Sequence, residues 1–186
     1  MSRGLGDVYK RQVLEKRRSI RKYTPQKVED EKIKAIIEAG LLAPSAHNTQ
    51  PWQILIVRES IPEIVKLLKE EGLKHPEDES ISKTADTISR GNTLLLVYSD
   101  HLENPEFTWL SIGAMIENML LKATDLGLGS LWIGNIVKIS SQVAHYFEID
   151  DTKLQLVSAV LLGYKEKDPK PLERKTLDSA ILKEEK

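Results

Sequence analysis

A short basic run at residues 17–22, RRSIRK, carries side chains that can bind a phosphate. Arg17, Arg18 and Arg21 present planar guanidinium forks that match phosphate oxygens, and the Ser19 hydroxyl adds a further donor. A solvated basic surface is the alternative interpretation. Contact with nucleic acid is a third, but no aromatic residues alternate with these cations as they do in a groove that follows a strand. The run therefore predicts a phosphate site or an exposed basic surface.

A loop at residues 43–52, APSAHNTQPW, offers groups for a flat heterocycle. Pro44 and Pro51 restrict its backbone, while Ser45, Asn48 and Gln50 supply hydroxyl and amide groups that pair with a polar ring edge. The alternative is an ordered turn in which these side chains satisfy local backbone groups. The loop is thus a second candidate for a binding site.

The glycine-rich stretch LGLGSLWIG at residues 126–134 contains Gly-x-Gly but does not fit a dinucleotide fingerprint. It follows an expected helix and precedes an expected strand, and Trp132 stands where the fingerprint needs its last glycine. Gly127 or Gly129 then ends the helix, and the chain at Ile133 and Gly134 can let a flat ligand approach the backbone.

No side chain stands out as a catalytic acid, base or nucleophile. The chain has no Cys, and its four His residues form no closely spaced pair, so we expect no metal ligand and name no catalytic residue. Neither a Gly-x-Ser-x-Gly elbow nor a Walker lysine is present. Groups that bind phosphate and heterocycles, without a catalytic set, indicate that a bound cofactor supplies the reactivity.

The elements that must position these groups alternate between helices and short strands. Apolar spacing predicts helices at 28–41, 61–72, 109–126 and 140–147, and strands at 53–57, 93–98, 130–133 and 154–162. The amphipathic stretch at 13–23 predicts a helix that breaks into a basic turn. The pattern predicts a mobile loop or a weak helix at residues 73–90. It predicts that the charged tail at 165–186 crosses the surface or reaches over a neighbour. Because the first 50 residues contain no strand, the pattern indicates an α+β layered domain and no regular βαβ array.

Composition limits the classes of function. The 186 residues suit one domain, and 27 Lys and Arg against 28 Asp and Glu give no global field for nucleic acid. No apolar run approaches the roughly 18 residues of a membrane span, so we expect no membrane partner and a cytoplasmic location. Residues 1–12 show no apolar period; we expect them to be an N-terminal extension, disordered or artefactual, before a domain at 13–186.

Taken together, four stretches resemble the nitroreductase family of FMN-dependent oxidoreductases. They are RRSIRKY at 17–23, LLAPSAHNTQPWQ at 41–53, SIGAMIENMLLKATDLGLGSLWIG at 111–134 and LLGYKEKDPKPLERKTLD at 161–178. The resemblance implies a mainly antiparallel sheet flanked by helices, and a homodimer with FMN at the subunit interface. It also implies that NADH or NADPH reduces nitroaromatic, quinone or related small acceptors by a ping-pong scheme. A non-catalytic FMN carrier or redox sensor is the alternative.

The resemblance also assigns residues to the cofactor. It places the FMN phosphate and ribityl chain at Arg17, Ser19 and Arg21, with Arg18 beside them, and returns Arg174 or Lys175 from the tail to the phosphate. Loop residues would line the flavin, and two residues would lie near its N5 side: Pro44, Ser45, Asn48 and Gln50 in the loop, and Ile133 and Gly134 at N5. No position in 73–90 can be matched.

The helix expected at 109–126 is apolar around most of its circumference. A single small domain would have difficulty covering such a helix, so the sequence predicts that it forms the dimer interface. The residues expected to need the partner are Ile112, Met115, Ile116, Met119 and Leu120, with Gly113 and Ala114 allowing close approach.

Overall fold

A single antiparallel sheet organises the molecule. The computed structural model describes residues 5–100 and 105–185, and side chains from residue 11 onward within these ranges. The described strands follow the order β1-β2-β4-β3. Their bounds are β1 (Gln53–Val57), β2 (Thr93–Ser99), β3 (Gly129–Ile133) and β4 (Gln155–Gly163). Each agrees with its expected range to within a residue at either end. The antiparallel register confirms the expected α+β fold.

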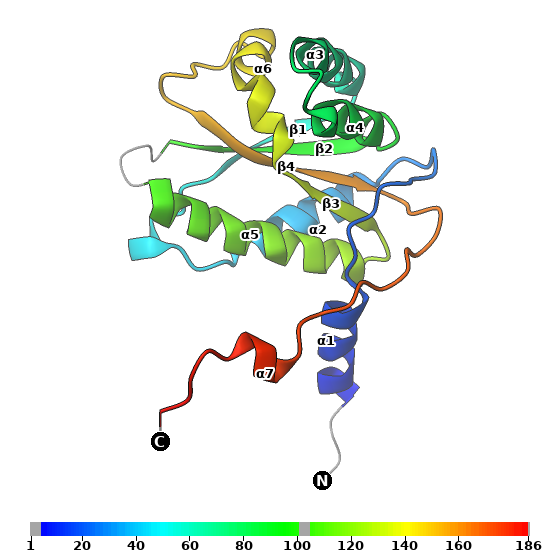
Figure 1. The fold of residues 1–186 in the computed structure, drawn as a ribbon, viewed down its shortest axis with the longest axis vertical. Coiled ribbons are helices and arrows are strands. Elements are labelled where there is room, and N and C mark those ends of the chain that lie inside the picture. Colours follow the sequence, from blue (N-terminus) through cyan, green and yellow to red (C-terminus); the bar gives the residue numbers. More distant parts are fainter. Residues whose placement is uncertain (1–4, 101–104, 186) are drawn as a thin grey trace.

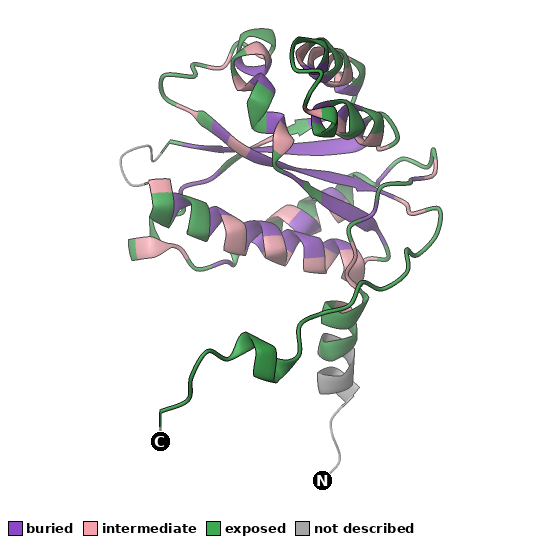
Figure 2. Ribbon diagram, viewed as in Figure 1, coloured by how far each residue is buried: buried purple, intermediate pink, exposed green. Residues whose placement is uncertain are grey.

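Helices cover both faces of this sheet (Figure 1). Helices α2 (Asp30–Leu41) and α5 (Pro105–Asp125) lie on one face, and α3 (Ile61–Lys74), α4 (Glu79–Ile88) and α6 (Ser140–Tyr146) lie on the other. The remaining helical segments are α1 (Leu5–Lys16), η1 (Ala46–Asn48), η2 (Asn135–Ile139) and α7 (Leu177–Ala180). All residues of β2 are buried, as an apolar strand covered on both faces should be (Figure 2).

Helix α5 is covered differently from the sequence expectation. Ile112, Met115, Ile116, Met119 and Leu120 are at most 4% exposed within one chain. Helix α2 buries these side chains because it packs closely on α5. At Gly40 of α2 an added Cβ would lie only 2.7 Å from a side-chain carbon of Met119. The prediction that these five residues need a second subunit is therefore wrong. The exposed apolar side chains of α5 are instead Phe107, Trp109 and Leu110.

The basic run lies on an extended segment beside the sheet and not on a helix. Helix α1 begins at Leu5 and ends at Lys16, so the helix expected from residue 13 begins earlier and ends before the basic run. The chain then runs along β3, where the backbone N–H of Ile20 donates to the Ser130 carbonyl at 2.9 Å. Further on, the N–H of Thr24 donates to the carbonyl of Tyr164, just beyond β4, at 2.7 Å. These bonds fix the backbone of the run against the sheet edge.

Residues 73–90, which the sequence left undecided, contain a helix. Helix α4 spans Glu79–Ile88, and the Asp78 carboxylate caps it by accepting from the backbone N–H of Ser80. Ile81, Ala85 and Ile88 recur at helical spacing and are buried. This apolar face packs into the core between α4 and the sheet. The packing places the opposite face of α4 beside the basic segment.

Candidate functional site

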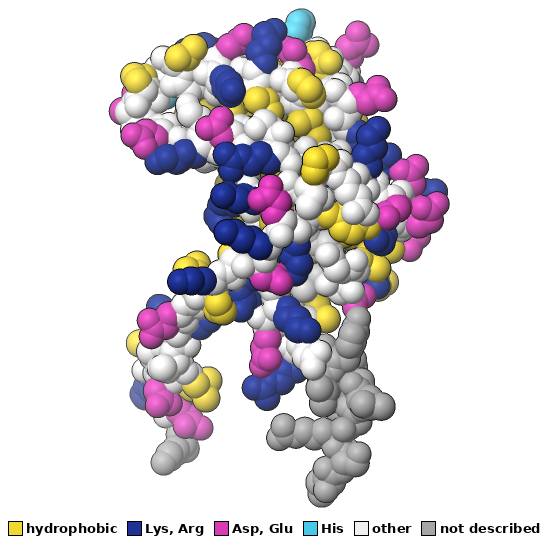
Figure 3. Space-filling model, turned by 90° about the vertical axis from the view of Figure 1, so that its right-hand side faces the viewer, with side chains coloured by type: hydrophobic (Ala, Val, Ile, Leu, Met, Phe, Trp, Pro, Cys, Tyr) yellow, Lys and Arg dark blue, Asp and Glu magenta, His cyan; other side chains and the backbone are white. Residues whose placement is uncertain are grey.

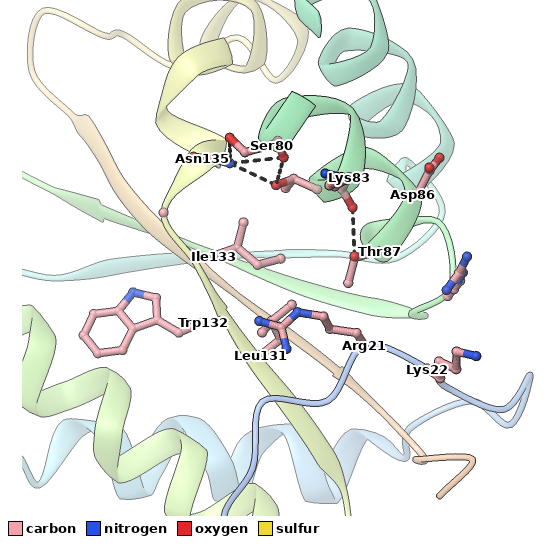
Figure 4. Close-up of a pocket in the computed structure, with 13 residues that line it drawn as sticks. Arg21, Lys22, Ser80, Lys83, Asp86, Thr87, Leu131, Trp132, Ile133 and Asn135 are labelled. Carbon is pink, nitrogen blue, oxygen red and sulfur yellow. Dashed lines mark hydrogen bonds between the residues drawn. The ribbon is translucent and has the colours of Figure 1, made fainter. Parts of the chain in front are cut away.

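A cavity of about 690 Å³ opens between β3, α4 and the segment that follows α1 (Figure 4). Such a volume is in the range that holds a small molecule or cofactor. Its lining includes Arg21 and Lys22 from the segment, Leu131, Trp132, Ile133, Gly134 and Asn135 at the end of β3, and Ser80, Lys83, Thr84, Asp86, Thr87 and Arg90 on and after α4.

The end of β3 presents apolar side chains on its two faces. Leu131 and Ile133 pack in the core on the α3 and α4 side, and the Trp132 ring lies toward Gly113 of α5. Leu131 and Ile133 are buried, whereas Trp132 is 45% exposed. The indole N–H of Trp132 donates to Ser158 Oγ at 2.6 Å, and this hydroxyl donates to the Ile133 carbonyl at 3.0 Å. A Cβ added at Gly134 would have no neighbour within 4 Å. The strand end is thus held in place by hydrogen bonds and leaves space beside its last glycine.

Helix α4 is tied to the strand end by one side-chain amide. Asn135 Nδ2 donates to the Ser80 carbonyl at 3.2 Å, to Ser80 Oγ at 3.0 Å and to Thr84 Oγ1 at 3.1 Å. Figure 4 shows these bonds crossing from η2 to α4. Sequence reasoning missed α4 as part of the site. The spacing of Ile81, Ala85 and Ile88 after an Asp was the signal that could have found it.

An ion pair supports the same contact. Lys138 Nζ lies 2.7 Å from Asp78 Oδ2. This hydrogen bond, with those from Ser80, lowers the pKa of Asp78 to about 2. The carboxylate is therefore ionised at neutral pH, both as the cap of α4 and as the partner of Lys138.

Three of the residues assigned from sequence meet in this cavity: Arg21, Ile133 and Gly134. Arg21 is exposed, and within the described part of the chain its side chain makes one long contact, 3.5 Å, from Nη1 to the Ser19 carbonyl. Ser19 is exposed, and its backbone forms a bridge with Ser130 of β3. The guanidinium of Arg21 is thus available to an anion, with Ser19 two residues before it.

The other two arginines of the run have protein partners. Arg17 Nε lies 3.4 Å from Glu117 Oε1 on α5. Arg18 Nη1 donates to the carbonyls of Glu15 at 2.5 Å and Arg17 at 2.8 Å, where α1 ends. Arg18 Nη1 therefore donates hydrogen bonds to carbonyls at the C-terminal end of α1. A phosphate bound by Arg18 would have to share this nitrogen with them.

The loop at 43–52 does not reach the cavity in one chain. Ala46 N–H donates to Ser111 Oγ on α5 at 3.2 Å, which holds the loop on the α5 side of the sheet. Gln50 N–H donates to Ser45 Oγ at 2.9 Å. Pro44, Ser45, Asn48 and Gln50 are absent from the cavity lining. Within one chain, Arg21, Ile133 and Gly134 therefore line the cavity together, whereas the assigned loop residues lie outside it.

The loop backbone is nevertheless unusual. His47, Asn48 and Gln50 have φ values of 53°, 56° and 48°, which is the left-handed region. A residue other than glycine in this region destabilises the folded state by about 1–3 kcal/mol, and strain of this kind concentrates at functional sites. Asn tolerates this region better than His or Gln do.

Arg174 and Lys175 lie on the tail beyond β4, and both are exposed. Among the described residues, no set of three or more His, Cys, Asp or Glu is grouped as a metal site. No described helix combines the length and apolarity of a membrane span.

The profile of the nitroreductase family matches residues 14–164. The chain belongs to this family. A "Putative NADH dehydrogenase/NAD(P)H nitroreductase" of Methanothermobacter thermautotrophicus is 31% identical over 176 residues, 88% of this chain and 83% of that protein. A protein of the same name from Archaeoglobus fulgidus is 34% identical over 121 residues, 63% of each chain. The expected family is thus confirmed.

A solved structure gives the same result for the fold of this nitroreductase-family chain. The crystal structure of a "putative nitroreductase in complex with fmn" from Desulfovibrio desulfuricans superposes with a TM-score of 0.80 at 28% identity. It covers 95% of this chain and 96% of the other.

Proposed function

We propose that this protein is an FMN-dependent oxidoreductase that uses NADH or NADPH to reduce small acceptors such as nitroaromatics and quinones. The observation that carries the proposal is the cavity at the end of β3, which combines apolar side chains of the strand with the exposed guanidinium of Arg21. Family membership supports it, as does the similar structure described with FMN.

The residues present fit FMN. Leu131 and Ile133 offer apolar side chains on the α4 side of β3, and the open space at Gly134 lets a ring lie against the backbone. Arg21 supplies positive charge for a phosphate or for the polar edge of the ring. The Thr87 hydroxyl also lines the cavity; it donates to the Lys83 carbonyl and can still accept from a ring N–H.

Bound FMN would supply hydride acceptance and hydride donation, chemistry that no side chain of this protein provides. The work of the chain is to hold and orient the ring against β3, to exclude water from it, and to place positive charge near its polar edge. Arg21 is the candidate for that charge, and the family resemblance assigns the backbone at Gly134 to the reacting side of the ring. Because one cavity serves donor and acceptor in turn, the expected kinetic pattern is ping-pong.

A second copy of the chain would complete the site. The loop with Pro44, Ser45, Asn48 and Gln50 lies away from the cavity of its own chain, so it can line FMN only across a twofold interface. An apolar groove of about 460 Å³ lined by α1, α2 and α5 suits such an interface. Leu14 and Leu42 in this groove are 60% and 84% exposed. The unusual backbone of the loop accords with a role in binding.

Steady-state oxidation of NADH and NADPH, with a nitroaromatic or a quinone as acceptor, tests the proposal. We expect turnover with at least one acceptor and parallel lines in double-reciprocal plots. A protein that binds FMN without turnover would be a carrier or redox sensor. Turnover that does not depend on FMN would contradict the proposal.

A further inference from the structure

The cavity carries three cations that the FMN assignment does not use. Lys22, Lys83 and Arg90 all line it and are all exposed. We call these three residues the rim cations. They come from three places in the chain: the segment after α1, the exposed face of α4, and the turn between α4 and β2. Figure 3 shows Lys and Arg side chains gathered on the face of the molecule to the right of Figure 1.

Little negative charge offsets the rim cations. Among the described residues, Lys22 and Arg90 take part in no ion pair, whereas Lys83 Nζ lies 2.6 Å from Glu79 Oε2. The one acidic residue of the lining, Asp86, lies 4.0 Å from Lys69. In a chain of net charge −1, this local excess of positive charge creates a field that attracts anions.

The backbone that carries the rim cations is fixed. The N–H of Glu166 donates to the Lys22 carbonyl at 3.2 Å, and Tyr23 beside it is 5% exposed. The turn with Arg90 packs closely against β4. A Cβ added at Gly91 would lie only 2.4 Å from a side-chain carbon of Leu161. The N–H of Arg90 also donates to the Thr87 carbonyl at 3.2 Å. The cations therefore keep their places around the cavity even though their side chains reach into solvent.

We propose that the rim cations bind the phosphate groups of the dinucleotide donor, NADH or NADPH, while its nicotinamide enters the cavity. This inference rests on the proposed function. FMN bound at Arg21 and the end of β3 would leave the exposed rim cations for the remainder of a long anionic substrate. Both donors carry a diphosphate, and NADPH adds a phosphate monoester. Exposed lysine and arginine side chains are long and flexible, so they can bind such phosphate groups at the surface without a buried pocket.

The test compares two triple variants of the FMN-loaded protein with matched loss of charge. Lys22→Gln/Lys83→Gln/Arg90→Gln removes the rim cations, and Lys66→Gln/Lys74→Gln/Lys153→Gln removes three exposed cations elsewhere. Because exposed ionic contacts are individually weak, we expect kcat/KM for the donor to fall by about tenfold in the rim variant only. Added salt should reduce that difference.

A loss confined to NADPH would assign the rim to the monoester, and an equal loss for both donors would assign it to the diphosphate. Either result supports the proposal. Two results would overturn it: an unchanged kcat/KM for both donors, or an FMN dissociation constant that rises as much as kcat/KM falls. The second result would place the FMN phosphate itself at the rim.

A binding measurement separates this proposal from the proposed function. Calorimetric titration with adenosine 2′,5′-bisphosphate needs no turnover. We expect the rim variant to bind it at least fivefold more weakly than the control variant. Equal binding by both variants would contradict the rim site even if the protein is an active oxidoreductase. An inactive protein that shows the difference would instead count against the proposed function alone.

Discussion

Arg17 and Arg21 stand four residues apart on one extended segment and face different neighbours. Arg17 lies 3.4 Å from Glu117 of α5, whereas Arg21 lines the cavity beside β3. The type of residue led to the prediction of an anion site here, because few side chains bind phosphate in a fork. The neighbours were not predictable, since they depend on how the segment lies against the sheet. Arg18 illustrates this, because its Nη1 is taken up by carbonyls at the end of α1.

The residue-scale prediction concerns FMN affinity. Replacing Arg17 and Arg21 together with Ala should weaken FMN binding by more than tenfold, because charge-assisted hydrogen bonds contribute about 1.5–3 kcal/mol each. Fluorescence titration of the flavin-free protein measures this. Arg58→Ala serves as the control, because it removes an arginine that pairs with Asp30 away from the cavity. Unchanged FMN occupancy in the double variant, or in Arg21→Ala alone, would contradict the assignment.

Helix α4 shows what the sequence could yield at the scale of an element. Strands and the long helices were predictable because their apolar patterns are strong and continuous. Helix α4 was not, because Pro76 and several acidic residues precede its short pattern and hide it in a longer polar window. Its place over the cavity depends on Asn135, which lies far along the chain and bonds to Ser80 and Thr84. No local pattern encodes such a contact.

The element-scale prediction concerns Asp78, which caps α4 and pairs with Lys138. Asp78→Ala should lower the free energy of unfolding at pH 7 more than Asp78→Asn, because Asn still caps a helix. The pKa of Asp78 is lowered in the folded state, so its contribution is complete above pH 4 and is lost as the pH falls toward about 2. Urea unfolding at several pH values measures both effects. If wild type and Asp78→Asn lose stability in parallel between pH 4 and pH 2, the ion pair does not stabilise the fold.

At the scale of the whole molecule, one chain presents only part of the proposed site. The expectation that α5 forms the dimer interface came from its apolar circumference, but α2 and the sheet cover Met115 and its apolar neighbours within the chain. Substitution of Met115 would therefore disturb the core and could not test the interface. The exposed apolar groove between α1, α2 and α5 is the better place for a substitution that tests the interface. The sequence could not distinguish the buried face of α5 from the face that lines this groove, because both are apolar.

Leu42→Glu should convert a dimer to a monomer. Leu42 lies in the groove and is 84% exposed, so a charge there spares the core and opposes a twofold contact. Leu73→Glu is the matched control, because Leu73 is 82% exposed on α3, on the other side of the sheet. Sedimentation and FMN retention on dilution provide the readouts. A Leu42→Glu protein that stays dimeric, or a monomer that retains stoichiometric FMN, would refute the shared site.

The N-terminal residues provide another prediction for the whole molecule. We expect a chain that begins at Gln12 to fold and bind FMN as the full chain does, because the domain proposed at 13–186 contains the described core and the cavity. Thermal unfolding measures the difference. A large fall in the melting temperature would show that the first turns of α1, which begins at Leu5, are docked on the rest of the molecule.

The central claim is that FMN binds at the end of β3, and the purified protein itself tests it most directly. We expect a yellow protein that releases FMN on denaturation, with one FMN per chain and a flavin spectrum that changes when Arg21 is replaced. A colourless protein that takes up no FMN when the cofactor is added would contradict the account.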